Sequence, residues 1–423
     1  LDDQWRRRIE TANDHLAQEG MRVLGVALRP LKALPDVMRE DTLETNLIFV
    51  GITGMIDPPR AEVREAVAEC RTAGIRTMMI TGDHPLTALH IARDLGIVDE
   101  EGALGDAITG RELAEMSVEE LEERVDDVSV FARVSPEHKV KIVEALKRKG
   151  HFVAMTGDGV NDAPALKRAD AGIAMGLKGS EAAKEAAELV LVDDNFASIV
   201  AAVREGRTVY DNLKKVISWT LPTNAGEAMT IVLALLLGMT LPITPIQILW
   251  INLITAVTLG IALAFEPTEK NTMRRPPRAR HEPLLNGGLV WHVVLVSILF
   301  LCGVFGTYQY AIDSGYSVDL ARTIALNTLV VMEIFQLFFI RNIYSTSLTW
   351  QGVRGTKVVW AVVIAVTVAQ FALTYLPPLQ TVFSTEPVPF FDGLLIVGVG
   401  IALFTIIEIE KQMRLAFRRM KGE

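Results

Sequence analysis

Hydrophobic residues change their spacing along the chain near Ser218. Before this residue they come in short runs, separated by stretches in which apolar positions recur every three or four residues. That pattern is typical of buried strands alternating with amphipathic helices. After Ser218 they come in long runs that approach the roughly 20 residues a helix needs to cross about 30 Å of hydrocarbon. The pattern therefore predicts a soluble half followed by a membrane half.

The soluble half alternates strands and helices. We expect a helix at residues 5–19 and a strand at 21–28, both the tail of an earlier domain, and a proline-containing connection at 31–45. The main body has expected strands at 47–56, 76–80, 152–155, 172–175 and 189–192 and expected helices at 61–73, 85–95 and 136–149. This alternation predicts a parallel sheet with helices on both faces. Ligands of such sheets bind beyond the carboxyl ends of the strands.

The membrane half contains six expected spans, at residues 217–238, 246–265, 289–310, 321–340, 358–376 and 394–409. A helical pattern at 195–215 runs into the first span and is the expected stalk between the two halves. Lys and Arg gather after the second span, after the fourth span and in the C-terminal tail, and the other connections between spans have none. Because cytoplasmic connections carry the excess of positive charge, we expect the soluble half and the C-terminus on the cytoplasmic side of a lipid bilayer.

Composition narrows the functional classes. The chain has 423 residues, of which 50% are hydrophobic, and a formal net charge of -9. No nucleic-acid partner is expected, since a phosphate backbone attracts basic surfaces. Cys70 and Cys302 fall in different halves, so no disulfide framework is readable and a reducing cytosolic face is the simplest assumption.

One stretch of the soluble half carries the pattern of a metal and phosphate site. Residues 155–166, MTGDGVNDAPAL, set Asp158 and Asp162 four residues apart, directly after an apolar run. A Mg²⁺ ion keeps several waters and needs only one or two carboxylates, and glycines let the backbone approach an anion closely. We expect Asp158 and Asp162 to hold Mg²⁺, with Asn161 positioning its waters. A strand-to-helix turn without a ligand is the alternative, because turns use the same residue types.

Two further strand ends carry polar groups. Asp57 follows the strand at 47–56, and Thr81-Gly82-Asp83 follows the strand at 76–80. The Thr81 hydroxyl and the Gly82 amide suit phosphate oxygens, and Lys139 supplies a fixed positive charge for a phosphoryl group in transfer. Taken alone, a lysine on an amphipathic helix is usually solvated, so the assignment of Lys139 depends on the residues before it.

These motifs together resemble a known family. The stretch 155–166, Asp57-Pro58-Pro59-Arg60, Thr81-Gly82-Asp83 and the segment FARVSPEHK that ends at Lys139 occur in the order found in P-type cation-transporting ATPases. The resemblance implies a haloacid-dehalogenase-like α/β domain followed by an all-α bundle of six membrane helices. It implies ATP as substrate, Mg²⁺ as cofactor and an aspartyl-phosphate intermediate.

The resemblance also assigns individual residues. Asp57, Thr81, Gly82, Asp83 and Arg133 join Lys139 and Asn161 in the phosphate site. Arg22 matches an arginine that contacts the phosphates of ATP, although an exposed surface arginine is the alternative for a single residue of this type.

The family's signature for the phosphorylated carboxylate, Asp-Lys-Thr-Gly-Thr, does not occur in this sequence, and neither do its Thr-Gly-Glu and Lys-Gly-Ala motifs. A covalent route needs such a carboxylate as nucleophile. We therefore expect the C-terminal part of a longer pump, a partner in its missing N-terminal part, and no phosphoenzyme from these residues alone. The expected parts are residues 1–45, the remnant of a nucleotide-binding domain; 46–195, the phosphorylation domain; 196–216, the stalk; and 217–423, the transmembrane domain.

Polar residues within the spans mark the expected transport site. A charge at mid-bilayer costs on the order of 2.5 to 3.5 kcal/mol on insertion scales, which makes Glu227 and Glu333 functional candidates. Asn224 shares a helix face with Glu227, and Asn252 with Thr255. Pro222 frees a carbonyl oxygen by interrupting its helix. For Asn and Thr, hydrogen bonding between helices is the structural alternative.

The same positions match the ion site of calcium-type, type II pumps, with one departure. Ala256 stands where those pumps have an aspartate shared between two ions, and losing a carboxylate lowers the charge and ligand count of a dication site. The resemblance implies Ca²⁺ first, with Mn²⁺, Na⁺, K⁺ or H⁺ as alternatives. Integral membrane location in a prokaryotic plasma membrane is expected.

Two other classes of protein remain open. A membrane-anchored haloacid-dehalogenase-like phosphatase requires an Asp-x-Asp at a strand end, and none fits. A catalytically silent membrane protein built from a truncated pump is the other alternative.

Overall fold

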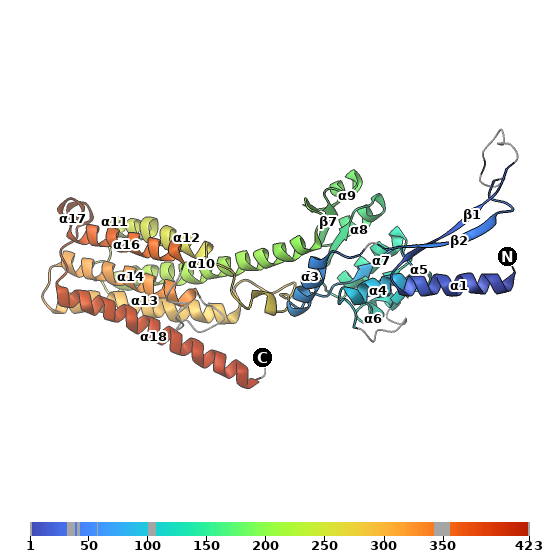
Figure 1. Ribbon diagram of the computed structural model, residues 1–423. Helices are drawn as coiled ribbons and strands as arrows, with labels where there is room; N and C mark the ends of the chain where they lie inside the picture. The colour runs from blue at the N-terminus through green and yellow to red at the C-terminus, as the bar shows by residue number, and fades with distance from the viewer. Residues whose placement is uncertain are drawn as a thin grey trace. The chain divides into compact units, whose positions relative to one another are not determined.

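The computed structural model describes residues 2–31, 39, 43–56, 58–99, 107–341 and 356–421 (Figure 1). They form two compact units, one of Leu1–Arg204 with Lys270–His281 and the other of Glu205–Glu269 with Glu282–Glu423. The first is an α/β unit and the second is all-helical, which agrees with the predicted fold class. The part boundaries expected at 45, 195 and 216 stay predictions.

The first two strands form a sheet of their own. Helix α1 (Asp3–Gln18) leads into β1 (Arg22–Leu28), and β1 pairs antiparallel with β2 (Ile48–Met55), so that Arg22 lies opposite Met55. The expectation that the strand at 47–56 joins the parallel sheet is therefore wrong. Its apolar run indicated a strand, but an apolar run does not select a partner. None of the residues of β2 is fully buried, unlike those of a central parallel strand.

The other strands of this unit are parallel and form two three-stranded sheets instead of the single expected one. Their orders are β3-β5-β4 and β6-β7-β8, which leaves β3 and β6 as edge strands. The strands are β3 (Met79–Ile80), β4 (Ala107–Thr109), β5 (Val130–Ala132), β6 (Ala154–Gly157), β7 (Ala171–Met175) and β8 (Leu189–Leu191). The helices are α3 (Ala61–Thr72), α4 (Pro85–Asp94), α5 (Gly110–Glu115), α6 (Val118–Arg124), α7 (Pro136–Arg148), α8 (Ala163–Arg168) and α9 (Glu181–Ala186).

Helix α7 and strand β3 connect the cores of the two parallel sheets. Ile142 of α7 packs in the cluster around Phe131, and Val143, the next residue, packs in the cluster around Met155. Ile80 of β3 packs against both clusters. The carboxyl ends of β3 and β6 are thereby held near the same helix, and this arrangement positions the site described below.

The second unit is a helical bundle. It contains five helices that are long and apolar enough to cross a membrane, counted over the residues described above. The expected span at 217–238 is not among them, although it is helical to Leu236, because polar residues such as Asn224 and Glu227 interrupt its apolar run. The helices are α10 (Phe196–Leu236), α11 (Pro245–Trp250), η3 (Ile251–Ala256), α12 (Val257–Ala264), α13 (Gly287–Asp313), α14 (Val318–Ile340), α16 (Lys357–Tyr375), α17 (Pro377–Phe383) and α18 (Phe390–Lys421).

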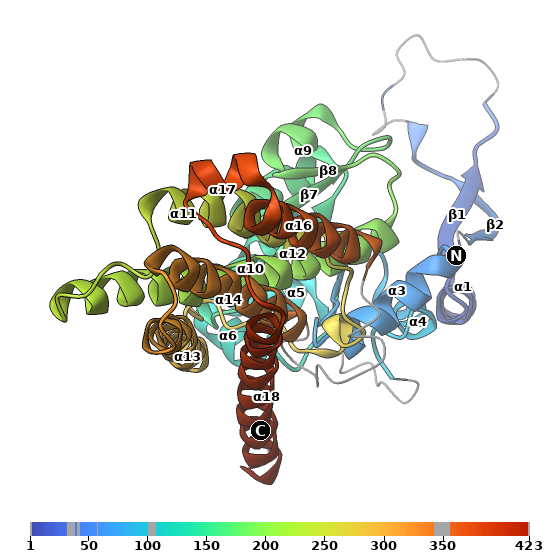
Figure 2. The ribbon, with the colours of Figure 1, turned by 90° about the vertical axis from the view of Figure 1, so that its left-hand side faces the viewer.

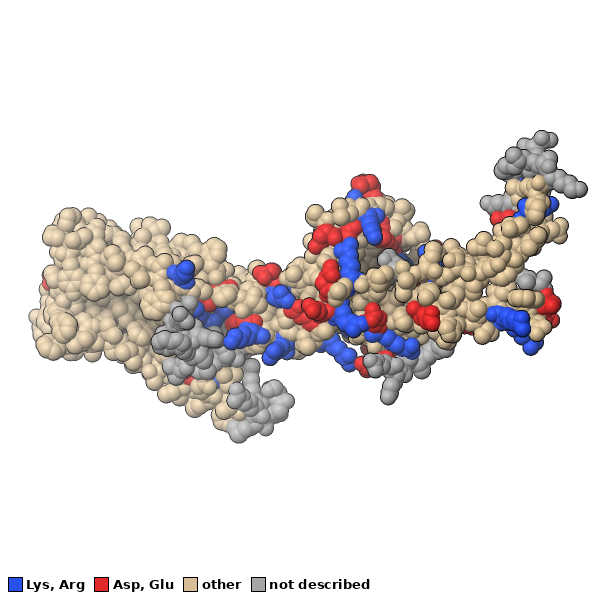
Figure 3. All heavy atoms as spheres, in the orientation of Figure 1, with Lys and Arg blue, Asp and Glu red and all other residues tan. Residues whose placement is uncertain are grey.

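Helix α14 is the centre of this bundle. It packs against α13 and α18 and also touches α12, η3 and α16, and Figure 2 shows it beside α13. Its side chains belong to one large apolar cluster that includes Trp219, Phe300, Leu329 and Leu403. Charged side chains are sparse over the bundle helices on the face drawn in Figure 3, except toward one end of the bundle. A bundle with this distribution of charge suits a lipid environment.

Candidate functional site

The loop after β3 is tied to the segment that follows β5. The Thr81 amide donates to the Phe131 carbonyl at 2.9 Å, and the Val134 amide donates to the Thr81 carbonyl at 3.2 Å. The Arg133 amide donates to the Asp83 carbonyl at 3.1 Å. These bonds hold Thr81-Gly82-Asp83 beside the residues that lead into α7. The Thr81 hydroxyl also donates to the Asp83 carboxylate at 3.1 Å.

Arg133 lies in the left-handed region of backbone conformation, with φ of 55°. A side chain there costs roughly 1 to 2 kcal/mol relative to glycine, and such strain persists only where the surroundings impose it. The amide bond to Asp83 supplies one such constraint, and the guanidinium side chain is exposed to solvent. The exposed side chain of Arg133 therefore lies next to the loop after β3.

Local sequence fixes the start of α7. Ser135 caps the helix in a reciprocal arrangement with His138, and Pro136 occupies the first turn, where its missing amide hydrogen costs no helix bond. Lys139 follows in the same turn, and its Nζ lies 2.5 Å from Oδ1 of Asp162. Both side chains are largely buried, at 18% and 8% exposure, so this pair joins α7 firmly to the loop after β6.

Asp162 organises the loop after β6. Its second oxygen, Oδ2, accepts the backbone amides of Asp158 at 3.2 Å and Gly159 at 3.1 Å. A side chain at Gly157 would place its Cβ 2.5 Å from the Cβ of Asp162, so glycine is required for this close approach. Both oxygens of Asp162 are engaged, whereas the side chain of Asp158 is exposed.

The structure places most of the predicted phosphate-site group at the carboxyl ends of β3, β5 and β6, in two sets. Thr81, Gly82 and Asp83 lie beside Arg133, and Lys139 bonds Asp162 in the loop that also carries Asp158 and Asn161. Asp57 lies outside the described residues. Arg22 is exposed on β1, and no contact among the described residues joins it to this group.

The site suits a Mg²⁺ ion that takes only one or two ligands from the protein. Among the described residues no three His, Cys, Asp or Glu side chains come together as a metal cage. Mg²⁺ does not need one, because it binds through one or two carboxylates with waters and phosphate oxygens. The exposed carboxylate of Asp158 is the suitable donor. The carboxylate of Asp162 is committed to Lys139 and to two amides, which suits a supporting role.

A segment from between two membrane helices belongs to the α/β unit. This linker loop, Lys270–His281, binds through Arg280, whose Nη2 lies 2.7 Å from Oδ1 of Asp170. Burial raises the pKa of Asp170, but the Val153 amide and the charges of Lys147 and Arg280 outweigh it, so this pKa falls below its usual value. No local pattern predicts this ion pair, since Asp170 and Arg280 lie 110 residues apart.

The linker loop also packs against apolar residues. Met273 lies in a buried cluster with Cys70 and Val200. Gly74 has a φ of +68°, and a Cβ there would lie 2.9 Å from the Cα of Pro276. A glycine at position 74 is therefore needed both for its backbone conformation and for the close approach of the loop.

The helical bundle contains a second group of polar residues. Glu227 of α10 and Glu333 of α14 are 6% and 1% exposed and are close enough to interact electrostatically, with Thr255 beside Glu333. The Asn252 side-chain amide donates to Oε2 of Glu227 at 3.4 Å. These four predicted residues converge. Asn224 is instead exposed on the surface of α10.

A π-helix and a hydrogen bond from Trp219 shape this group. Residues Ile251–Ala256 form a π-helix, a form that is rare and frequent at functional sites. The Trp219 indole donates to the main-chain oxygen of Glu333 at 3.2 Å, which ties α10 to α14. Oε1 of Glu227 and both carboxylate oxygens of Glu333 have no hydrogen-bond partner among the described residues. Buried carboxylates without partners are costly, and a bound cation removes that cost.

Comparisons with known proteins match both units of the chain. The family described as "haloacid dehalogenase-like hydrolase" matches residues 13–170, and the family "Cation transporting ATPase, C-terminus" matches residues 240–413. A protein named "Probable cation-transporting ATPase F" from Mycobacterium tuberculosis is 47% identical over 403 residues, which cover 95% of this chain and 44% of that protein.

A protein named "Calcium-transporting ATPase" from Bacillus subtilis is 44% identical over 389 residues, covering 91% of this chain and 43% of that protein. "Calcium-transporting ATPase 1" from Bacillus cereus is 40% identical over 423 residues, covering 96% and 47%. The chain belongs to the P-type cation-transporting ATPases. It spans somewhat less than half the length of these relatives.

Membership of the P-type ATPases explains why the two groups of residues occur in one chain. The α/β unit carries the segment that matches the hydrolase family, and the bundle carries the segment that matches the cation-transporter family. The resemblance drawn from the motifs, the fold class and the integral membrane character are thereby confirmed. The individual site residues and the transported cation stay predictions.

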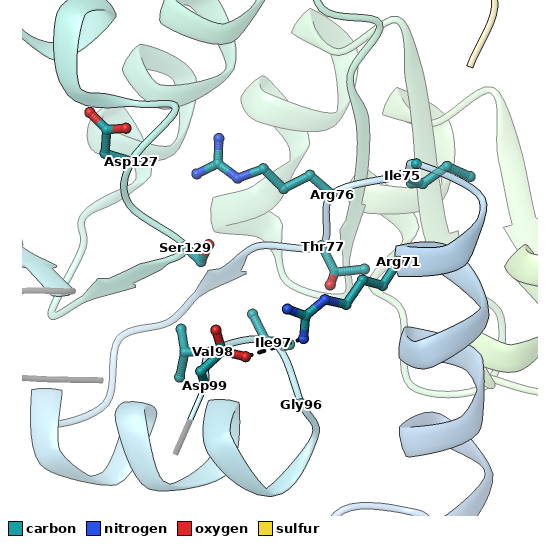
Figure 4. A pocket seen from close by; sticks show the side chains of 11 residues that line it. Arg71, Ile75, Arg76, Thr77, Gly96, Ile97, Val98, Asp99, Asp127 and Ser129 are labelled. Carbon is teal, nitrogen blue, oxygen red and sulfur yellow. Dashed lines mark hydrogen bonds and ion pairs between the residues drawn. The ribbon is translucent and has the colours of Figure 1, made fainter. Parts of the chain in front are cut away.

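A cavity of about 660 Å³ lies elsewhere on the α/β unit of this P-type ATPase (Figure 4). Thr77 and Ser129 line it and lie just before β3 and β5, two residues and one residue away, so the cavity is at the amino ends of these strands. An ion pair of 3.2 Å between Arg71 and Asp99 is at its edge. The phosphate-site residues lie at the opposite, carboxyl ends, and none of them lines this cavity.

Two contributors to the geometry of these sites were not predicted. The capping pair Ser135 and His138 carries a helix-start signal within the segment FARVSPEHK. Trp219 could not be found, because an indole in a membrane helix has no distinctive pattern.

Proposed function

We propose that this chain is the C-terminal part of an ATP-driven cation pump that couples Mg²⁺-dependent aspartyl-phosphate chemistry to ion transport, with Ca²⁺ as the first candidate. The observation that carries the proposal is the pairing of two sites in one chain. One is the Lys139–Asp162 pair that assembles a phosphate site at strand ends. The other is the pair of buried glutamates in the bundle.

In the phosphate site, each residue has a separate role. Lys139 and the Gly82 amide hold phosphate oxygens, and the Thr81 hydroxyl turns from Asp83 toward the same group. Asp158 holds Mg²⁺, which neutralises charge on the phosphate when bound. Asp162 keeps Lys139 and the loop in place. Positioned charges of this kind supply most of the catalysis in phosphoryl transfer.

The nucleophile comes from outside this sequence. In the proposed step a carboxylate oxygen attacks the γ-phosphorus of ATP, the bond from phosphorus to the ADP oxygen breaks, and an acyl phosphate forms; water later cleaves it. Strands β3 and β6 are edge strands of the two parallel sheets, and Ile80 packs against the hydrophobic clusters of both sheets. This arrangement supports insertion of a nucleophile-bearing strand between β3 and β6. The 423-residue chain alone is therefore expected to form no phosphoenzyme.

The cation site is built from Glu227, Asn252, Thr255 and Glu333. Two carboxylates and neutral oxygens suit a hard divalent cation. Ala256 leaves the site one carboxylate short of the calcium-pump pattern, which favours a single ion. Two relatives are named as calcium-transporting and another only as cation-transporting, so Mn²⁺, Na⁺, K⁺ and H⁺ belong in the test.

We place the protein in the plasma membrane of a prokaryote, with the α/β unit and the C-terminus in the cytoplasm. The positive charge of the connections supports this orientation. Protease accessibility of the linker loop and the C-terminal tail in sealed vesicles tests it, and both are expected on the cytoplasmic side.

Cation-stimulated ATP hydrolysis by the full-length protein tests the function. The purified pump in vesicles should hydrolyse ATP faster with one of the candidate cations, and Glu227→Gln and Glu333→Gln should each remove that stimulation. A matched control is Glu386→Gln, because Glu386 is a bundle glutamate outside this group whose carboxylate accepts from the Ser317 hydroxyl, a bond that a glutamine oxygen also accepts. Hydrolysis that responds to no cation would favour a catalytically silent membrane protein instead.

A further inference from the structure

Pro222 leaves a carbonyl oxygen of α10 without its helical partner. Proline has no amide hydrogen, so the carbonyl four residues earlier, that of Ser218, loses its bond in the helix ladder. The structure supplies a replacement from α14, because the Gln336 side-chain amide donates to the Ser218 carbonyl at 3.4 Å. Pro222 and Gln336 thus form a matched pair across two helices.

This bond fixes the orientation of the Gln336 amide. A backbone carbonyl can only accept, so the NH₂ group of Gln336 must face Ser218, and a flipped amide would place two acceptors together. The side-chain oxygen of Gln336 is therefore turned away from Ser218. Gln336 follows Glu333 by three residues, which puts both side chains on one face of α14.

The oxygen of Gln336 has no hydrogen-bond partner among the described residues, and its side chain is completely buried. Leaving a buried acceptor unsatisfied is unfavourable. Both oxygens of Glu333 and Oε1 of Glu227 are in the same condition. Four acceptors without donors in one part of a bundle form the environment that a desolvated cation requires.

We propose that the side-chain oxygen of Gln336 is a ligand of the transported cation, next to Glu333. The proposal rests on the proposed pump function and adds a residue that the transport site did not include. Pro222 contributes by exposing the carbonyl that holds the amide end of Gln336 in place. Ala256 supplies no carboxylate to the site. The neutral oxygen of Gln336 adds a ligand there, but it does not replace the missing negative charge.

Cation binding by the full-length protein tests this ligand. Gln336→Leu keeps the side-chain size and removes both the oxygen and the amide. We expect the apparent affinity for Ca²⁺, measured by equilibrium binding and by activation of ATP hydrolysis, to fall about tenfold, because one ligand oxygen contributes on the order of one hydrogen bond to a charged group. If another cation stimulates the pump, that cation replaces Ca²⁺ as the probe.

A second background separates ligation from the helix-bridging bond. Pro222→Ala restores the amide that pairs with the Ser218 carbonyl, so the bridging role of Gln336 is no longer needed there. If Gln336 is a ligand, Gln336→Leu should lower the cation affinity by a similar factor in the Pro222 and the Pro222→Ala backgrounds. A loss of affinity that disappears in the Pro222→Ala background, or unchanged affinity in both, would overturn the proposal.

Glu333→Gln distinguishes this inference from the underlying function. If Glu333→Gln loses cation binding while Gln336→Leu keeps it, only the ligand role of Gln336 is wrong. If Glu333→Gln also keeps full binding, the pump assignment of this site is wrong, and the inference is overturned with it. The midpoint of thermal unfolding, measured for each variant without cation, identifies any general loss of folding.

Discussion

Replacing Asp162 by alanine should loosen the loop after β6 while leaving the rest of the α/β unit folded. The change removes the partner of Lys139 and the acceptor for the Asp158 and Gly159 amides. Breaking a buried ion pair from one side typically costs about 3 to 5 kcal/mol. Lys139 retains 18% exposure, so water replaces part of the lost bond, and we expect the low end of that range.

Amide hydrogen exchange on the 423-residue chain measures this effect where it occurs. Local opening easier by about 3 kcal/mol speeds exchange by roughly two orders of magnitude, since about 1.4 kcal/mol corresponds to a factor of ten. The Asp158 and Gly159 amides should show this increase. Amides of β7, which pair with β6 and β8 in the sheet ladder, should change much less.

Glu144→Ala is the matched control for this experiment. Glu144 is also on α7, and its partner Arg168 is 63% exposed, so this pair is worth less than about 1 kcal/mol. Exchange at Asp158 and Gly159 should be unaffected. Unchanged exchange at these amides in Asp162→Ala, or an equal increase in Glu144→Ala, would refute the role assigned to Asp162.

Three further predictions concern the linker loop and the bundle. The pKa of Asp170 is lowered in the folded chain, so its ion pairs stabilise the docked linker loop at pH values above the usual aspartate pKa of about 4. As the pH falls below that value, the linker loop should become sensitive to protease. The variant Asp170→Asn should show the same sensitivity at neutral pH. Gly74→Ala should lower stability by at least about 1 to 2 kcal/mol from backbone strain alone, with further loss from the clash with Pro276, seen as a lower midpoint of thermal unfolding; the opposite shift would contradict the close approach. Trp219→Phe keeps an aromatic ring but loses the bond to Glu333, and should cost about 1 kcal/mol in the same assay, whereas no change would mean that the bond contributes nothing.

The sequence predicted the kind of each large element but not the pairing of strands. Short apolar runs located β6, β7 and β8, although only β7 is mostly buried. The strand at 47–56 looked the same but pairs antiparallel with β1, and nothing local distinguishes the two outcomes. Strands β4 and β5 were not predicted, because the apolar runs at 107–108 and 130–132 are shorter than the run at 189–192 that indicated β8.

The candidate sites were predictable to different degrees. Motif residues such as Lys139 and Asp158 were found because a phosphate site requires particular groups at strand ends. Gln336 and the Asp170–Arg280 pair were not, because their roles depend on contacts between distant segments. Helical spacing put Asn224 on the face of Glu227, and the structure leaves its side chain exposed, so its place in the transport site stays a prediction.

The central claim is that a cation held between Glu227 and Glu333 controls phosphate chemistry at Lys139 and Asp158. Phosphoenzyme formed by the full-length protein from ATP labelled in its γ-phosphate, measured with and without the stimulating cation, tests that coupling directly. The account predicts cation-dependent labelling that Glu333→Gln abolishes and that Asp158→Asn abolishes at any cation concentration. Labelling that is independent of cation, or that survives in Glu333→Gln with unchanged cation dependence, would contradict it.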